Sequence, residues 1–258
     1  MAKLISTDLT NNKLCVLEYT TTDGQMLSIN PESFNAKIVT HTYTDIGRII
    51  FGTPITKIGD NAFYNCNILT SVTIPDSVTT IGECAFWECY SLTSVTIPNS
   101  VTTIDRNTFR SCNSLKNVTI GDSVTTIGYG AFHLCNSLTN VTIPDSVTTI
   151  GAWVFNGCSS LTNVTIPDSV TTIGDSAFYD CKSLSHITIE KNVKQIGEDA
   201  FRGCYNVDMI ICCATTPPKL HRSSDSTPTS FEKFKTLVVP TGCEEAYTNS
   251  DWGYYLKE

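Results

Sequence analysis

The stretch LTNVTIPDSVTTIGAWVFNGC, residues 138–158, decides the fold of this 258-residue chain. Within it, the segment Val141–Ile143 alternates apolar and polar side chains, and its β-branched residues favour a strand. Pro144 ends that strand, at a point where a missing backbone N–H is tolerated. Val147 and Ile150 lie three residues apart and predict a second short extended or turn segment.

The end of this unit is expected to lead the chain into the next copy. Gly151 permits a tight bend, because glycine has no Cβ to restrict its backbone. The pattern A-F-x-x-C that follows in most copies, as at Ala177, Phe178 and Cys181, suits one or two helical turns. We expect the Phe and Cys of that pattern to face inward.

The same unit recurs seven times without an insertion, at a step of 23 residues. The recurring columns are Ile58, Ile81, Ile104, Ile127, Ile150, Ile173 and Ile196; Phe63, Phe86, Phe109, Phe132, Phe155, Phe178 and Phe201; and Cys66, Cys89, Cys112, Cys135, Cys158, Cys181 and Cys204. Stacked strands would form a parallel sheet with a rise of about 4.8 Å per coil. One coil alone cannot bury its apolar side chains, so stability is expected from the stack.

The pattern L-x-x-V-x-I-P-x-x-V-x-x-I-G-x-x-A-F-x-x-C, from about Ile46 to Ile211, resembles the BspA-like leucine-rich repeats of bacterial and some protist surface proteins. The resemblance implies an α/β solenoid, a right-handed leucine-rich repeat superhelix with a parallel β-sheet, short helical turns and caps at both ends. Departures from the pattern affect single turns: Gly121 and Glu190 replace Pro, Thr108 and Val154 replace Ala, and Asp105 replaces Gly.

The repeats divide the chain into three predicted parts: an N-terminal cap region at 1–45, the repeat array at 46–212, and a C-terminal excursion and cap at 213–258. Caps are expected because terminal coils would otherwise expose core and an unpaired strand edge. Strand-like pieces occur at Leu14–Leu17 and Lys37–Val39. Ile46, Ile49 and Phe51 lie one period before Leu69, Val72 and Ile74, which predicts a degenerate coil there.

The C-terminal part begins with an atypical last coil at Val207, Ile210 and Cys212. Thr236–Pro240 predicts a final strand, and Glu244–Tyr247 predicts the start of a short helix. Trp252, Tyr254 and Tyr255 are expected to cover the end of the stack. The alternative is that these aromatic residues form a ligand site.

Composition narrows the class of partner. A net charge of −8 and only 16% charged residues leave no basic stripe for nucleic acid or anionic membrane. No apolar run is long enough to span a bilayer, so membrane insertion is not expected. Met1–Thr10 lacks a signal-peptide pattern. The resemblance therefore implies a cell-surface or secreted protein whose signal has been removed, and a cytoplasmic protein is the alternative; we expect a monomer.

The twelve cysteines are interpreted as structural rather than reactive. Seven of them form one column, which predicts a buried ladder of reduced thiols. The alternative is a set of disulfides between coils, because adjacent coils bring the Cα atoms of these cysteines within disulfide range. A straight ladder does not give the tetrahedral ligand set of a metal site. Cys212 and Cys213 are expected to point inward and outward, with a redox-active pair as the alternative.

No catalytic residues or cofactor are predicted. The four histidines, His41, His133, His186 and His221, lie in no recognisable triad, zincin motif or nucleophile elbow, and the chain has no phosphate-binding loop. We therefore expect that the protein is not an enzyme and binds neither a metal nor a cofactor.

Binding residues are expected on two surfaces. The outward strand positions form a flat, uncharged ladder suited to a repetitive ligand, and copies differ most around the turn, where exposed aromatics favour an interface. The predicted binding residues are Tyr64, Trp87, Tyr90, Tyr129, His133 and Tyr179 at the turns, with Asn117, Asn140, Asn163 and His186 on the strands. The expected function is recognition or adhesion, with a host matrix protein, another cell-surface protein or a glycan as partner. A structural spacer in a larger assembly is the alternative.

Overall fold

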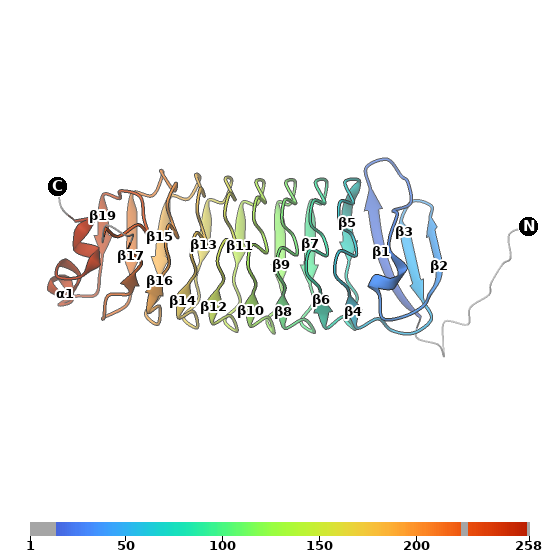
Figure 1. The fold of residues 1–258 in the computed structure, drawn as a ribbon, viewed down its shortest axis with the longest axis horizontal. Helices are drawn as coiled ribbons and strands as arrows, with labels where there is room; N and C mark the ends of the chain where they lie inside the picture. Colours follow the sequence, from blue (N-terminus) through green and yellow to red (C-terminus); the bar gives the residue numbers. More distant parts are fainter. Residues whose placement is uncertain (1–13, 223–226, 257–258) are drawn as a thin grey trace, which may run out of the picture.

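The computed structural model describes residues 14–222 and 227–256, which form an elongated β-solenoid (Figure 1). Each coil contributes a longer strand, a two-residue strand and a turn stretch; the longer strands belong to two sheets, and the two-residue strands form one. The longer strands are β5 (Leu69–Thr73), β7 (Ser94–Ile97), β9 (Asn117–Ile120), β11 (Asn140–Thr142), β13 (Asn163–Thr165), β15 (His186–Ile189) and β17 (Met209–Cys212). The two-residue strands are β4 (Lys57–Ile58), β6 (Thr80–Ile81), β8 (Thr103–Ile104), β10 (Thr126–Ile127), β12 (Thr149–Ile150), β14 (Thr172–Ile173), β16 (Gln195–Ile196) and β18 (Lys219–Leu220).

Neighbouring coils pair in parallel, with each residue opposite its equivalent one repeat away. Asn140 lies opposite both Asn117 and Asn163, and Ile150 lies opposite Ile173. The parallel two-residue strands form an eight-stranded sheet from β4 to β18. Both predicted extended segments of the repeat are therefore confirmed as strands of a parallel solenoid.

The core is a set of columns that run along the stack. All seven Phe residues of the repeat are buried, and their rings stack nearly parallel with centroids 5.0–5.5 Å apart. Stacked or offset aromatic pairs contribute about 0.5–1.5 kcal/mol beyond the area that they bury. The Phe column therefore joins successive coils as well as filling each one.

The predicted helical turns are wrong. The stretch after each two-residue strand is a pair of tight turns, because two positions in every repeat have a positive φ between 50° and 79°. A helix requires negative φ throughout, so it cannot continue through such residues. The first position holds Asn61, Cys84, Asn107, Gly130, Trp153, Ser176 and Asp199, and the second holds Asn65, Glu88, Ser111, Leu134, Gly157, Asp180 and Gly203.

These turns bond to the next coil through their backbones. The N–H groups of Asn107, Phe109 and Ser111 donate to the carbonyl oxygens of Tyr129, Ala131 and His133, at 2.7–2.9 Å. The same pattern of alternate donors recurs along the array. The alternating backbone conformation directs these donors toward the C-terminal neighbour, which satisfies groups that a buried turn would otherwise leave unpaired.

Gly151 is required for a different reason from the one expected. It is not among the glycines with positive φ, so the bend does not need its conformational freedom. A Cβ at this position would lie 2.8 Å from the carbonyl oxygen of Ile127 in the preceding coil. The glycine is therefore needed because the two backbones approach closely.

The cysteine column is buried, as predicted, and its thiols are hydrogen-bonded. Six of them donate Sγ–H to the Phe carbonyl oxygen of the preceding coil at 3.1–3.3 Å. Burial raises the pKa of the Cys158 thiol to about 12, which keeps it protonated and unreactive. Cys212 is buried and Cys213 partly exposed, which confirms the predicted inward and outward orientation.

The N-terminal unit, residues 14–51, differs from the coils. Strands β1 (Cys15–Thr21), β2 (Ile38–Tyr43) and β3 (Gly47–Phe51) pair antiparallel, and a short 3₁₀ turn, η1 (Pro31–Ser33), lies between β1 and β2. β1 also pairs antiparallel with β5, which places it between β3 and the first coil. The expected degenerate coil at Ile46–Phe51 is therefore wrong, because β1 occupies the edge that it would need.

The C-terminal segment, residues 213–222 and 227–256, packs against the last coil. Strand β19 (Thr236–Val238) pairs with β17, and helix α1 (Glu244–Thr248) and the 3₁₀ turn η2 (Asp251–Tyr254) follow. Phe231 stacks on Phe201 at 5.2 Å and so extends the Phe column by one ring. Trp252 is fully buried against Phe231 and donates from Nε1 to the Pro218 carbonyl oxygen. Trp252 therefore packs as part of the core rather than as an exposed ligand-binding ring.

Candidate functional site

The turn stretches carry a connected strip of aromatic and cationic side chains across five coils. We call it the turn-face strip. It comprises Tyr64, Trp87, Arg106, Arg110, Tyr129, His133 and Trp153. Three of these rings are between 37% and 45% exposed, and exposed apolar residues gathered on one face mark interaction surfaces more often than scattered ones do.

The first cluster of the strip is built on Trp87. The Tyr64 ring meets it edge-on at 5.3 Å, and the Arg110 guanidinium lies over its other side at 5.1 Å from the ring centroid. These three residues occupy the same position in successive repeats, which is why they lie in a line. A cation–π contact of this kind holds an arginine in place while leaving its hydrogen-bonding edge available.

The second cluster is built on Trp153. Its ring stacks on Tyr129 at 6.2 Å and meets His133 edge-on at 5.4 Å. Arg106 lies over the other side of Tyr129, with its guanidinium carbon 5.2 Å from the ring centroid, and reaches Glu83 at 3.5 Å. The two clusters are thus joined through coil three, which supplies both arginines.

Trp153 has an unfavourable backbone for its size. Its φ is 62°, in the left-handed region, where bulky side chains are rare. At the same position five of the other six copies carry Asn, Gly, Ser or Asp, which tolerate this conformation better, and the sixth carries Cys84. Trp153 is nevertheless 37% exposed, so core packing does not explain why tryptophan stands there.

His133 differs from the expectation of an exposed binding residue. The side chain is only 8% exposed, beneath Trp153. Burial and the nearby Arg110 charge lower the pKa of His133 from 6.5 to about 4, so it is neutral at physiological pH. His133 therefore supports the strip from below and is not a free surface histidine.

The remaining predicted turn residues differ in exposure. Tyr90 is 39% exposed, and Tyr179 is half-buried. Trp87 is half-buried too, because Arg110 covers it. Tyr90 and Tyr179 are outside the strip, since they make none of its ring contacts.

The strand face carries the predicted polar ladder. Asn117, Asn140 and Asn163 are exposed and lie directly opposite one another on β9, β11 and β13. His186 follows on β15, which belongs to a different sheet. The predicted binding residues therefore lie on two separate faces, and the structure does not bring them into one site.

Threonines of the repeat fall into two groups. Some hydroxyls donate to the preceding coil, as Thr93 does to the Thr70 carbonyl oxygen at 3.1 Å. Others on the strand face make no hydrogen bond to any residue in the described ranges: Thr73, Thr96, Thr119, Thr142 and Thr165. Only the second group presents hydroxyls to a ligand.

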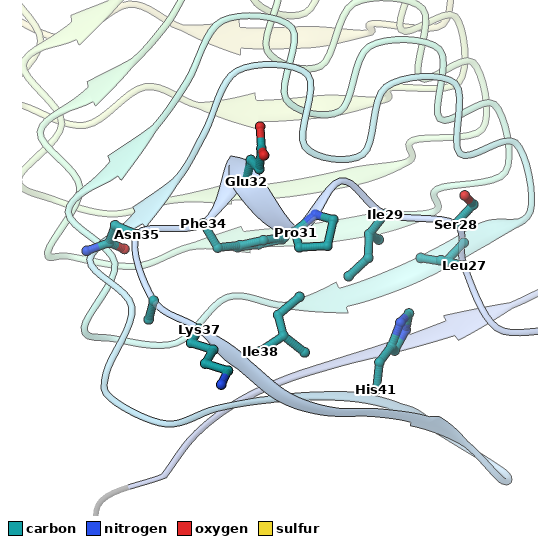
Figure 2. A pocket seen from close by; sticks show the side chains of 11 residues that line it. Leu27, Ser28, Ile29, Pro31, Glu32, Phe34, Asn35, Lys37, Ile38 and His41 are labelled. Atoms are coloured by element: carbon teal, nitrogen blue, oxygen red, sulfur yellow. The ribbon is translucent and has the colours of Figure 1, made fainter.

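A groove of about 910 Å³ lies in the N-terminal unit, away from the predicted residues (Figure 2). Figure 2 shows Ile29, just before η1, and Pro31, the first residue of η1, across the groove from Ile38 on β2. His41, which also lines the groove, is hydrogen-bonded through Nε2 to the Tyr19 hydroxyl at 2.6 Å. A second groove of about 460 Å³ shares Leu27 and Ser28 with it and is lined by Tyr64. The turn-face strip therefore ends in a hollow at its N-terminal side.

Sequence reasoning missed Trp153, Arg106 and Arg110 as members of the site. Trp153 stands in the first positive-φ column, where Asn, Asp, Ser and Gly are otherwise frequent. That enrichment of turn-forming residues was the available signal, and a tryptophan among them stands out. The arginines were visible as variable positions, but their contacts depend on the close approach of successive coils.

The described parts of the chain hold no group of three or more His, Cys, Asp or Glu side chains arranged to bind a metal ion. Among the same residues, no helix has the length and apolar character needed to cross a membrane.

The chain belongs to the BspA-type leucine-rich repeat family. The family model for the BspA type leucine rich repeat region matches residues 36–151 and 125–250, with six copies. This agrees with the recurring Ile, Phe and Cys columns and with the parallel solenoid that they build.

Among the solved structures similar to this chain are two bacterial leucine-rich repeat proteins. A leucine-rich cell-surface protein from Faecalibacterium prausnitzii shares 39% identity with a TM-score of 0.60, over 73% of this chain and 50% of that one. A leucine-rich repeat protein from Eubacterium ventriosum shares 30% identity with a TM-score of 0.49, over 60% and 40%. The chain thus spans half or less of the length of these two proteins. No curated protein matches it.

Proposed function

We propose that this chain is a recognition module that binds a protein or glycan partner along its turn-face strip, without chemical turnover, as part of a bacterial cell-surface protein. The repeat family consists typically of binding or adhesion modules, which supports the general class. The cell-surface location is supported by the description of the Faecalibacterium relative. In this proposal the N-terminal unit and the C-terminal segment act as caps.

The observation that carries the proposal is the backbone of Trp153. A left-handed conformation at a non-glycine residue costs on the order of 1 kcal/mol or more. Trp153, at φ 62°, is 37% exposed and packs on Tyr129 and His133 rather than in the buried core columns, so the core does not offset that strain. Strain kept at an exposed aromatic is typical of a functional position, and Trp is among the residues most enriched at the centres of interfaces.

The test begins with a screen of the purified protein against a glycan array and immobilised matrix proteins. Any partner is then titrated against Trp153→Asn, which replaces the ring with the residue found at the equivalent positions 61 and 107. We expect affinity to fall at least tenfold, with the fold intact by circular dichroism. Thr142→Ala on the strand face is the control and should leave affinity unchanged. Equal binding by the Trp153 variant would contradict the proposal.

A structural spacer is the second candidate, and the unbroken 23-residue register favours it, because such a stack extends a molecule without need of a partner. A spacer would tolerate loss of Trp87 or Trp153 without change in the behaviour of the parent protein. Trp153→Asn therefore separates the two candidates.

A further inference from the structure

The centre of the turn-face strip contains an arginine without a counter-ion. Of the five arginines, all within the described ranges, four lie within 4.0 Å of a carboxylate oxygen, and Arg110 does not. Arg202 occupies the same repeat position as Arg110 but is paired with Asp199 at 3.4 Å. In a chain of net charge −8, a guanidinium with no acidic neighbour is an exception.

Two N–H groups at this point also lack an acceptor. Trp87 Nε1 and Arg110 Nε are shielded from water and have no hydrogen-bond partner among the described residues. Each covers the other, because the guanidinium lies over the indole. Buried donors without acceptors are unfavourable. Rotation of the long Arg110 side chain would expose both donors to an incoming acceptor, and a carboxylate accepts from guanidinium more strongly than a neutral group does.

Aromatic rings lie on both sides of Arg110 along the axis of the stack. Tyr64 and Trp87 come from the two preceding coils, and Tyr129 and Trp153 from the two following ones. A ligand that places an anionic group on Arg110 therefore meets exposed ring surface in both directions. The acidic Glu83 on the same face is engaged by Arg106 at 3.5 Å, which reduces its repulsion of an anion.

The spacing of the strip distinguishes a saccharide from a peptide. Successive coils are 5.0–5.5 Å apart, as measured between Phe ring centroids. An extended peptide places side chains of one face about 6.6 Å apart, so it loses register with the coils within a few residues. An extended saccharide chain advances by close to one coil spacing per sugar. Its apolar ring faces also suit stacking on aromatic side chains.

We propose that the turn-face strip binds an extended acidic saccharide chain, with a uronate carboxylate on Arg110 and the flanking sugars against the rings on either side. This inference rests on the proposed function, since it names the ligand class of the same surface. The bound saccharide would run parallel to the solenoid axis, toward the groove beside Tyr64.

The test is calorimetric titration of the intact chain with two probes, a hyaluronan hexasaccharide and hexagalacturonate, each compared with its carboxyl methyl ester. We expect at least one acid to bind and its ester to bind at least tenfold more weakly. Arg110→Gln should cause a similar loss. Arg202→Gln is the matched control, since it removes an arginine from the same repeat position, and it should leave affinity unchanged.

The inference would be overturned by no binding of either acid, by equal binding of acid and ester, or by an equal effect of Arg110→Gln and Arg202→Gln. Tighter binding of a poly-glutamate peptide than of both saccharides would also overturn it, in favour of an acidic protein. If the inference is overturned but Trp153→Asn still lowers the affinity for a partner found by screening, only the proposed ligand class has failed. If Trp153→Asn affects no partner, the proposed function has failed with it.

Discussion

The strand face and the turn face of the same seven coils follow opposite rules. On the strand face the outward residues are nearly uniform, and Thr recurs at one position on β5, β7, β9, β11 and β13. On the turn face the exposed positions change from copy to copy, and in five coils they assemble an aromatic and cationic strip. Both faces rest on the same buried columns. The comparison teaches that the turns can vary because their folding depends on backbone contacts between coils.

The turn backbone explains this tolerance. Its N–H groups bond to the next coil whatever side chain is present, as Asn107, Phe109 and Ser111 illustrate. Only the inward Ala, Phe and Cys positions are restricted by burial. The outward turn positions are therefore open to selection for binding, at a modest cost in backbone strain.

The largest effect should come from breaking the column that both faces share. Phe132→Ala removes a fully buried ring stacked between Phe109 and Phe155, and it should lower the free energy of unfolding by about 3–5 kcal/mol. Urea denaturation followed by circular dichroism measures this. Thr142→Ala on the strand face should change stability by less than about 0.5 kcal/mol. Similar losses in the two variants would contradict the division into core and face.

A smaller effect should follow from the buried histidine of the turn face. The pKa of His133 is lowered from the usual 6.5 of a histidine to about 4 in the folded chain, so the unfolded chain binds more protons between those limits. Stability should therefore fall by about 1–2 kcal/mol as the pH is lowered from 7 to 5. The measurement compares denaturation at the two pH values with that of His133→Asn, which matches Asn156 in the next coil. If the variant has the same pH dependence, His133 is not the titrating group.

The smallest effect should be a difference in stability between Gly and Ala variants, with opposite signs at Trp153 and Thr142. Because φ is positive there, Trp153→Gly should be more stable than Trp153→Ala by about 1 kcal/mol. At Thr142, within β11, the order should reverse, since glycine weakens a strand. Thermal denaturation of the four variants provides the data. If the Ala variant is more stable than the Gly variant at both sites, the turn backbone is not left-handed at residue 153.

The coil could be predicted from the sequence because its signals are local and repeated seven times. Val141 and Ile143 alternate with a polar residue, and both are buried. The period of 23 residues then sets the register between coils, since each strand must bring its own Val and Ile opposite the next. Burial of the Cys column could be predicted from the same period, but the hydrogen bonds from its thiols to the Phe carbonyl oxygens could not.

What could not be predicted depends on contacts between coils and between distant segments. A-F-x-x-C was interpreted as helical, because backbone bonds to the next coil leave no periodic trace in the side chains. Strand β3 was interpreted as a coil because Ile49 and Phe51 have the spacing of one, while β1 takes the place beside β5. Burial of His133 likewise depends on the ring of Trp153, which comes from the following coil.

The backbone bonds of the turns run in one direction along the molecule. Each coil presents the same donors to its successor and the same acceptors to its predecessor, and at the C-terminal end the Ser230 carbonyl and the Glu232 carboxylate accept from Phe201 and Gly203. Whole repeats are consequently interchangeable modules. Duplication or loss of one unit in the gene changes the length of the molecule without altering either end, so copy number can set how far the turn-face strip stands from the ends of the chain.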